Sequence, residues 1–518
     1  MGAEKIAINP TAQVGLGLGG LLVGLLTVIA HWRSRLGQFI EWDDTTHITQ
    51  NVVIRALTLE HLRVMFTTAI AKLYIPLTWL SLAVDYQVWG RNPAGYHLTN
   101  LILHVANTLL VLVLVRRLLE GRHSQPIWVA LLTAALFGVH PLRVESVAWA
   151  TERKDVLFVS FYLLALGAYL PWASAQKRSA YWCCFGCFVA ATLAKSTAVT
   201  LPVVLLLLDH YWARRSAWRE KIPFLVVSAL VGVVTIVAQA SGTGQTLPTT
   251  AVLPIWARLG LVGYCALFYV QKFFWPFHLT AIYPTFDEMG WTFATSLVFA
   301  VVLAVGTGFL FGLRRRLPLV WPSWLFYLVT LAPTIGLVPA GIHVVADRFS
   351  YLPLLGLAVP TAAGLVWLGM RQRLVWLGVA GGLAGLIFFT DQRTGEWHDT
   401  ATLFTAALRE NPRCLPAHVN LTLWYTRQHQ YDEAIAHGQQ AVALAPAGLP
   451  GRKNLAVAFI RAGRYRDAIT VLRPAAEHAV ADPEVWRALA ECFDAVGEPV
   501  NAAVARSRVH NPTPPPGS

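Results

Sequence analysis

Two adjacent carboxylates, Asp43 and Asp44, follow Trp42 shortly after the first apolar segment of the chain. A neighbouring charge and partial burial can raise the pKa of one member of such a pair towards neutrality, which suits a general base. The simpler interpretation is a solvated acidic turn or a helix cap. The residues alone leave both interpretations open, and Asp43 and Asp44 are both candidate catalytic residues.

A second polar group covers residues 140–155. Helical spacing would put Glu145 and Glu152 on one face, with Arg153 beside it. An interfacial helix whose bases extend to the lipid headgroups would explain Arg153, but it explains His140 at the membrane exit less easily. A pocket shaped by His140 and Glu145 is the alternative.

Two bases also stand next to apolar segments further along the chain. Lys195 has no acidic neighbour in sequence, and Arg348 follows Asp347 in a short loop. A base at the outer end of a span needs an anionic partner, and a lipid phosphate is the obvious candidate. The simpler alternatives are contact of Lys195 with the headgroups and a local salt bridge between Asp347 and Arg348.

The composition indicates which elements must position these groups. Of the 518 residues, 55% are hydrophobic and 13% are charged, and the mean hydropathy is +0.51. A soluble domain is about one-quarter charged. The net charge of +13 lies largely in short loops between apolar runs, which argues against nucleic acid as a partner. The sequence predicts an all-α, polytopic membrane protein.

Hydropathy predicts eleven membrane spans. They are placed at residues 14–31, 97–115, 127–139, 156–172, 180–194, 197–212, 222–240, 291–313, 319–339, 349–369 and 374–390. A further apolar segment, 256–275, is predicted to lie at the interface, because five basic clusters then fall on one side of the membrane. This count gives a cytoplasmic N-terminus and an extracytoplasmic C-terminus. The largest outer loop is residues 32–96, and most carboxylates lie on the outer side.

The sequence predicts no metal site. No CxxC pairs or histidine-rich cluster suggest zinc, and the six cysteines form no recognisable disulfide framework. The N-terminus lacks a clear signal-peptide cleavage site, so the first apolar segment is interpreted as an uncleaved span.

A 34-residue period begins after Thr390, where the composition becomes that of a soluble helical domain. The period is marked by Ala434, Ala468 and Ala502. Small Ala residues let paired helices approach closely, and Gly463 and Gly497 are predicted to lie at the turns between them. The sequence therefore predicts a transmembrane domain at 1–390, tetratricopeptide repeats at 391–510 and a disordered tail at 511–518.

Six motifs occur in a characteristic order along the chain. They are Trp42-Asp43-Asp44 with Asn51, Tyr74-Ile75-Pro76-Leu77-Thr78, Tyr96-His97 with Asn100 and His104, His140-Pro141 with Glu145, Ala194-Lys195, and Asp347-Arg348 with Tyr351-Leu352-Pro353. With the C-terminal repeats, the chain resembles the transmembrane and tetratricopeptide repeat-containing O-mannosyltransferases and their bacterial relatives. These enzymes belong to the C-type membrane glycosyltransferase superfamily. The resemblance covers nearly the whole chain.

The resemblance implies transfer of a sugar, mannose by analogy, from a polyprenyl-phosphate-linked donor to an extracytoplasmic acceptor. The expected acceptor is a protein Ser or Thr hydroxyl bound through the repeat groove, although the short repeat domain leaves a lipid or glycan open. The localisation implied is a bacterial inner membrane.

The resemblance also implies roles for the candidate residues. Asp43 or Asp44 would be the base of a single displacement. The donor phosphate would be held by Lys195, Arg153 and Arg348, and the pocket would be shaped by His140, Glu145, Asp347 and Trp42. No cofactor is required, because a phosphate is already a good leaving group, although the paired acids could hold a divalent ion.

Two other functions remain open from the sequence. An O-antigen ligase or oligosaccharyltransferase also combines many spans with a large outer loop, but the ligases usually carry that loop late in the chain. A non-catalytic scaffold that recruits partners through the repeats would leave Asp43 and Asp44 dispensable.

Overall fold

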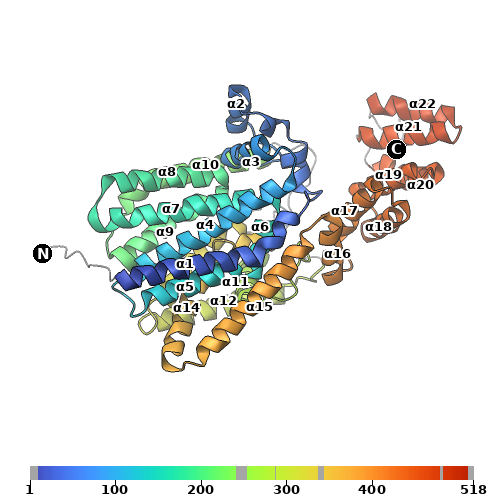
Figure 1. Cartoon of the computed structure of the whole chain (residues 1–518). Coiled ribbons are helices and arrows are strands. Elements are labelled where there is room, and N and C mark those ends of the chain that lie inside the picture. The colour runs from blue at the N-terminus through green and yellow to red at the C-terminus, as the bar shows by residue number, and fades with distance from the viewer. Residues whose placement is uncertain (1–9, 241–253, 286–287, 336–343, 479–481, 511–518) are drawn as a thin grey trace. The chain divides into compact units, whose positions relative to one another are not determined.

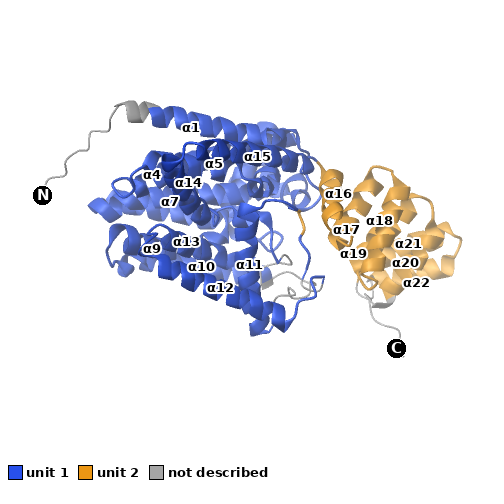
Figure 2. Cartoon of the chain, turned by 90° about the horizontal axis from the view of Figure 1, so that it is seen from below, with its two compact units in different colours: residues 1–279, 283–398 blue, residues 280–282, 399–518 orange. Residues whose placement is uncertain are grey.

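The computed structural model describes residues 10–240, 254–285, 288–335, 344–478 and 482–510. The predicted disordered tail, 511–518, lies outside these residues. The chain divides into two compact units, residues 1–279 with 283–398 and residues 280–282 with 399–518 (Figure 2). The change of composition after residue 390 falls within the last helix of unit 1, because the charged end of that helix extends to Glu396.

Unit 1 is a bundle of helices (Figure 1). They are α1 Pro10–His31, α2 Leu59–Thr67, α3 Pro76–Trp89, α4 Pro93–Leu119, α5 Pro126–Val139, α6 Val144–Ala148, α7 Arg153–Ala175, α8 Arg178–Ala194, α9 Leu201–Leu207, α10 Ile222–Ala240, α11 Ile255–Phe274, α12 Phe293–Leu313, α13 Val320–Leu331, α14 Leu355–Arg371 and α15 Val375–Glu396. Within the described residues, helices lie in all eleven segments that hydropathy predicts as spans.

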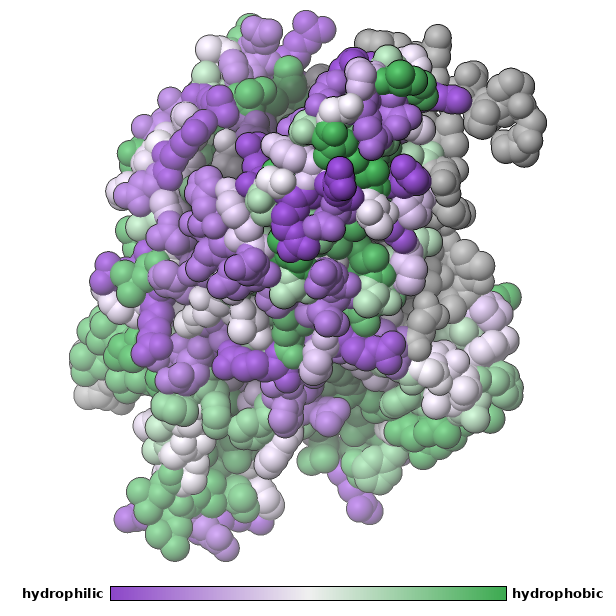
Figure 3. Space-filling model, turned by 90° about the vertical axis from the view of Figure 1, so that its right-hand side faces the viewer, coloured by the Kyte–Doolittle hydropathy of each residue, from purple (hydrophilic) through white to green (hydrophobic). Residues whose placement is uncertain are grey.

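Seven helices in the described residues are long and apolar enough to cross a membrane, or up to eight if the bent pair α5–α6 is one span. The three predicted spans that remain after these eight correspond to helices below this length. Of these, α8 and α14 have 17 residues each, and α13 has 12. The chain is therefore a multi-pass membrane protein. Apolar side chains gather along the lower part of the face shown in Figure 3, with hydrophilic ones above them.

The spans differ in how deeply they lie within the bundle. About 61% of the apolar stretch of α7 and 50% of that of α4 is buried, whereas α12 and α15 each bury 6%. An apolar helix that is exposed along most of its length is suited to contact with lipid. The polar residues at the start of α7 consequently lie within the bundle and not on its lipid-facing surface.

All five basic clusters lie at one end of unit 1. The clusters are Arg116, Arg117 and Arg122; Lys177 and Arg178; Arg214, Arg215, Arg219 and Lys221; Arg314, Arg315 and Arg316; and Arg371 and Arg373. Residues next to these clusters contact one another in four places: Arg122 with Trp212, Trp172 with Glu220, Trp321 with Tyr211, and Trp128 with Trp376. We call this the basic end, and the opposite end of α4 and α7 the outer end. The clustering agrees with the topology expected from the distribution of bases.

The segment predicted to lie at the interface forms α11, which packs closely against α12. A Cβ atom added to Gly260 would lie 2.4 Å from Ser296, and one added to Gly263 would lie 2.4 Å from the backbone of Phe299. The helix α10 starts at the basic end, and α12 finishes there.

Unit 2 consists of helix pairs with the predicted 34-residue repeat. Its helices are α16 Thr400–Glu410, α17 Leu415–Arg427, α18 Tyr431–Leu444, α19 Leu449–Arg461, α20 Tyr465–His478, α21 Pro483–Ala495 and α22 Pro499–His510. Gly463 and Gly497 have φ of +74° and +78° at the turns, and His429 has +61° at the same position of the first repeat. Since only glycine adopts this backbone without strain, the turns explain the two glycines.

Candidate active site

The outer end is built around a break in one helix pair. Helix α5 ends at Val139, and α6 continues after His140-Pro141 at an angle of 59°. Trp149 is then extended, with φ −87° and ψ +120°, before the chain turns into α7. The prediction of one continuous helical face over residues 145–152 is therefore wrong. Pro141 lacks the backbone N–H that would continue α5, and the break turns the following residues into the bundle.

Arg348 joins the two carboxylates of this broken segment. Its guanidinium contacts Glu145, and its backbone N–H donates to the other oxygen of Glu145 at 3.0 Å. Glu152 lies 3.5 Å from the Arg348 guanidinium and 2.9 Å from Lys154. Burial lowers the pKa of Arg348, but Glu145 and Glu152 outweigh it and hold that pKa above its usual value.

The local salt bridge considered for Asp347 and Arg348 does not form. Asp347 is buried, accepts a hydrogen bond from the Tyr283 hydroxyl at 2.7 Å, and lies 3.4 Å from Arg393. Burial raises the pKa of Asp347, while Arg393 lowers it. Asp347 thus anchors the loop that carries Arg348. Its side chain faces away from Glu145 and Glu152, which are the partners of Arg348.

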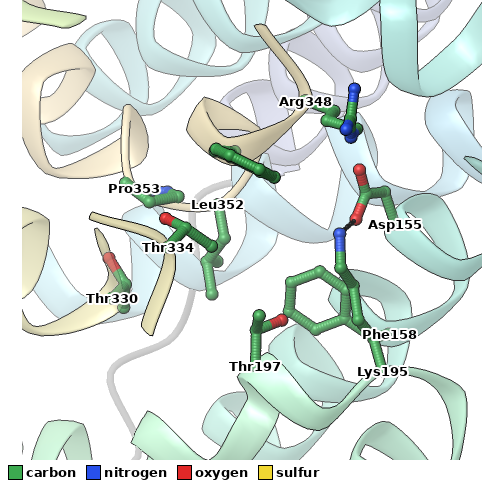
Figure 4. Close-up of a pocket in the computed structure, with 10 residues that line it drawn as sticks. Asp155, Phe158, Lys195, Thr197, Thr330, Thr334, Arg348, Leu352 and Pro353 are labelled. Carbon is green, nitrogen blue, oxygen red and sulfur yellow. Dashed lines mark hydrogen bonds and ion pairs between the residues drawn. The ribbon is translucent and has the colours of Figure 1, made fainter. Parts of the chain in front are cut away.

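Lys195 and Arg348 line the same small cavity (Figure 4). The ammonium of Lys195 contacts Asp155, which also accepts a hydrogen bond from Ser146 at 3.1 Å. In Figure 4, Asp155 lies between Lys195 and Arg348. The cavity has a volume of about 20 Å³ and its other lining residues are Phe158, Thr197, Thr330, Thr334, Phe349, Leu352 and Pro353. Two of the three predicted phosphate-binding bases are thereby brought together.

The two members of the acidic pair have different surroundings. Asp44 is fully buried, and its oxygens accept hydrogen bonds from Ile40 N at 2.8 Å, from Thr151 N at 2.9 Å and from the Thr151 hydroxyl. Burial raises the pKa of Asp44 to about 7, although these hydrogen bonds lower it. Asp43 is partly exposed and interacts electrostatically with Lys154 and His47. Asp44 therefore holds the loop, and Asp43 is the accessible carboxylate.

Trp42 forms an aromatic surface next to these charges. Its ring stacks on that of Trp149 with centroids 4.8 Å apart and an angle of 23° between the planes. Lys154 and Arg348 lie 5.8 and 5.6 Å from the Trp149 ring. Trp149 is buried, so Trp42 is the member of the pair whose ring is partly exposed beside these bases.

Two residues predicted for the site have their polar groups engaged elsewhere. Arg153 is fully buried and its guanidinium bonds to a set of four groups: Asp85, Asn100, the Ser81 hydroxyl and the Tyr96 carbonyl. This arrangement ties α3 and α4 to α7 and leaves Arg153 away from the cavity lining. The imidazole of His140 stacks on Phe273 and bonds to its carbonyl oxygen at 3.0 Å, which connects the helix break to α11.

Sequence reasoning did not select Lys154, Asp155 or Glu152. All three lie in the polar segment 140–155, but their partners Asp43, Lys195 and Arg348 are distant in sequence, and no local pattern connects them. Among the residues that the structure describes, no group of three or more His, Cys, Asp or Glu side chains is arranged to hold a metal ion.

Comparisons with known proteins add an independent observation. Tetratricopeptide repeat profiles match residues 391–448 and 425–492. The protein O-mannosyl-transferase Tmtc3 of Drosophila melanogaster is 23% identical over 478 residues, which cover 77% of this chain and 51% of the relative. Human TMTC3 is 22% identical over 526 residues, covering 86% and 53%. The chain is therefore similar to protein O-mannosyl-transferases over most of its own length.

The chain spans about half the length of the curated relatives that it matches. Human TMTC4 is 30% identical over a shorter stretch of 207 residues, or 35% of this chain and 28% of the relative. A crystal structure of ArnT from Cupriavidus metallidurans bound to undecaprenyl phosphate aligns over 97% of this chain and 78% of that one, at 14% identity and a TM-score of 0.38.

Proposed function

We propose that the chain is a membrane glycosyltransferase that moves a sugar from a polyprenyl-phosphate-linked donor to a hydroxyl group on the extracytoplasmic side. The observation that carries the proposal is the outer end itself. There an accessible carboxylate, Asp43, a stacked tryptophan pair and a cavity with two bases lie in one connected network of charges. The names of the homologues support this reaction class and make mannose the first sugar to test.

Asp43 is the base in this proposal. Its carboxylate takes the proton from the acceptor hydroxyl as that oxygen attacks the anomeric carbon of the donor. The bond between the anomeric carbon and the phosphate oxygen breaks, and its electron pair leaves with the polyprenyl phosphate. Asp44 is unsuited to this role, because it is fully buried and its oxygens accept hydrogen bonds from Ile40 and Thr151.

Lys195 and Arg348 hold the phosphate in this proposal. They approach the same cavity from α8 and from the loop before α14. Positive charge that is already in place stabilises the charge that develops on a leaving phosphate, so no general acid is needed. The proposal requires no metal ion or other cofactor.

The proposed orientation puts the basic end in the cytoplasm of a bacterial inner membrane, with the outer end and unit 2 on the other side. The repeats of unit 2 would bind the acceptor, and a protein Ser or Thr side chain is the acceptor that the names of the homologues favour.

The experiment is transfer of radiolabelled mannose from a polyprenyl-phosphate donor to acceptors in membranes containing the full chain. Wild type is compared with Asp43→Asn, Asp44→Asn and Glu60→Gln, the last being an exposed carboxylate of the same outer loop. Loss of a correctly placed base costs about 10²- to 10⁴-fold in rate. We expect that loss in Asp43→Asn, while Glu60→Gln keeps the wild-type rate.

A transfer rate in Asp43→Asn that equals wild type at equal expression would exclude Asp43 as the base. If no donor supports transfer and a cellular phenotype survives both Asp43→Asn and Asp44→Asn, the chain acts as a scaffold.

A further inference from the structure

Arg143 differs from every other buried base in the part of the chain that the structure describes. Five basic side chains are buried: Arg143, Arg153, Lys154, Lys221 and Arg393. Four of them have a carboxylate within 4 Å, whereas Arg143 has none among the described residues. An unpaired charge inside a membrane protein is costly, and such residues mark functional positions more often than ordinary packing positions.

The partners of Arg143 are backbone carbonyls and aromatic rings. Its guanidinium donates to Phe137 O at 3.1 Å, Ser350 O at 3.1 Å and Tyr351 O at 2.7 Å. It also lies 4.5 Å from the ring of Phe137 and 5.3 Å from that of Tyr351. These partners satisfy hydrogen bonds and stabilise a cation, but they carry no full negative charge. Among the described residues, the positive charge of Arg143 therefore has no carboxylate partner.

The two carbonyls at Ser350 and Tyr351 belong to the segment that lines the cavity. Arg348 and Phe349 line it on one side of them in sequence, and Leu352 and Pro353 on the other. The charged groups at the cavity are already paired, Lys195 with Asp155 and Arg348 with Glu145. The unmatched charge behind this segment is thus that of Arg143.

We propose that Arg143 is a positioning residue for the lipid phosphate, and this inference rests on the proposed function. Its hydrogen bonds hold the segment that carries Arg348. Its charge, which no described carboxylate pairs, adds to the attraction of this segment for an anion. Arg143 does not touch the donor, because its guanidinium is enclosed by Phe137, Ser350 and Tyr351.

The test measures binding of a polyprenyl phosphate to the purified full chain in detergent, with the uncharged polyprenol of the same length as the control ligand. Wild type is compared with Arg143→Gln, which can still donate hydrogen bonds but has no charge, and Arg143→Lys, which keeps the charge. We expect Arg143→Gln to weaken binding of the phosphate about tenfold, the scale of one unit charge in a partly screened site. Binding of the polyprenol should not change, and Arg143→Lys should stay near wild type.

Equal affinities of wild type and Arg143→Gln for the phosphate would overturn the proposal. So would a loss in Arg143→Lys as large as that in Arg143→Gln, because the residue would then act through hydrogen-bond geometry alone. If Arg143→Gln does not fold, Arg143→Lys decides through pH. Its affinity relative to wild type should fall as the pH rises from 7 to 9, since a buried lysine loses its proton at a lower pH than an arginine at the same position.

The outcomes for Arg143 and for the proposed function can be separated. Wild type that binds the polyprenyl phosphate but transfers no sugar would contradict the proposed function and leave the role of Arg143 intact. Normal sugar transfer together with unchanged phosphate binding in Arg143→Gln would contradict only the role of Arg143.

Discussion

Each end of α7 carries a buried network of ion pairs, and the two networks differ in one respect. At the basic end, Asp209 contacts Lys221 and lies 2.8 Å from Arg215, and Arg215 lies 2.6 Å from Glu220. Tyr169 of α7 donates its hydroxyl to Asp209 at 2.6 Å. Every charge in this network has an opposite partner within it.

The outer network contains similar ion pairs, but not every charged group in it is enclosed and paired. Lys195 and Arg348 line a cavity, Asp43 is partly exposed, and Arg143 has no carboxylate partner among the described residues. Buried charges alone are therefore a poor indicator of a site, because both ends have them. Space next to the charges and a charge without a partner distinguish the outer end. The basic network is better explained as a structural link between α7 and the segment that connects α9 to α10.

The largest effect on stability should come from Lys221→Met at the basic end. It leaves Asp209 buried with a weaker set of partners, and breaking a buried pair in this way costs about 3–5 kcal/mol. Thermal unfolding of the purified protein in detergent measures the loss. The folded fraction should keep the wild-type KM for the donor. A raised donor KM at normal stability would mean that the basic end also takes part in binding.

The matched change at the outer end is Lys195→Met. It removes a base from the cavity, and we expect kcat/KM for the donor to fall about 30- to 100-fold, in line with about 2–3 kcal/mol for a lost charge contact. Because Asp155 loses its partner, stability should fall as well. The double variant with Asp155→Asn should recover stability but not donor use. Recovery of both would show that Lys195 only balances Asp155.

A smaller pair of changes replaces an arginine by a lysine at each end. Arg348→Lys should lower kcat/KM for the donor about tenfold, because a lysine cannot contact Glu145 and a phosphate in the same planar geometry. Arg215→Lys is its control at the basic end and should leave donor kinetics unchanged. Steady-state kinetics at varied donor concentration separates them. An equal loss of kcat/KM for the donor in both variants would contradict the assignment of donor binding to the outer end.

The smallest effect concerns the pH dependence of stability. Burial raises the pKa of Asp44 to about 7 in the folded protein, above the ordinary value of 3.8. Its contribution to stability is thus fully present below about pH 4 and is lost as the pH rises through 7. In Asp44→Asn that part of the pH dependence should disappear from the melting temperature measured between pH 5 and 8. A curve parallel to wild type would show that Asp44 does not titrate in this range.

The sequence predicts those features that are encoded locally. The 34-residue period predicts the helix pairs of unit 2, and its Gly463 and Gly497 lie at turns with positive φ. The apolar runs predict where helices form in unit 1. The roles within the acidic pair could not be predicted, because Thr151, which buries Asp44, lies 107 residues away.

The sequence predicts Arg153 as a phosphate-binding residue because its contact partner, Asp85, is distant in the chain. Its salt bridge to Asp85 joins residues 68 apart in sequence, and nothing at either position signals the contact. Conversely, Arg143 lies within the motif from which the sequence predicts His140 and Glu145 as pocket residues. Arg143 is distinctive because no described carboxylate lies next to it in the folded protein. The sequence alone does not give the neighbours of a side chain in space.

The contact between Lys195 and Asp155 has a consequence for turnover. The cavity of about 20 Å³ has room for roughly one water molecule, so in the proposed reaction a phosphate group enters only after the lining side chains move, and Lys195 then has to release Asp155. A donor that binds there has to exchange with an internal carboxylate for the same ammonium group. That exchange weakens the affinity for the donor and equally for the spent lipid carrier. In the proposed reaction, closure of the pair would then favour release of the carrier after each transfer.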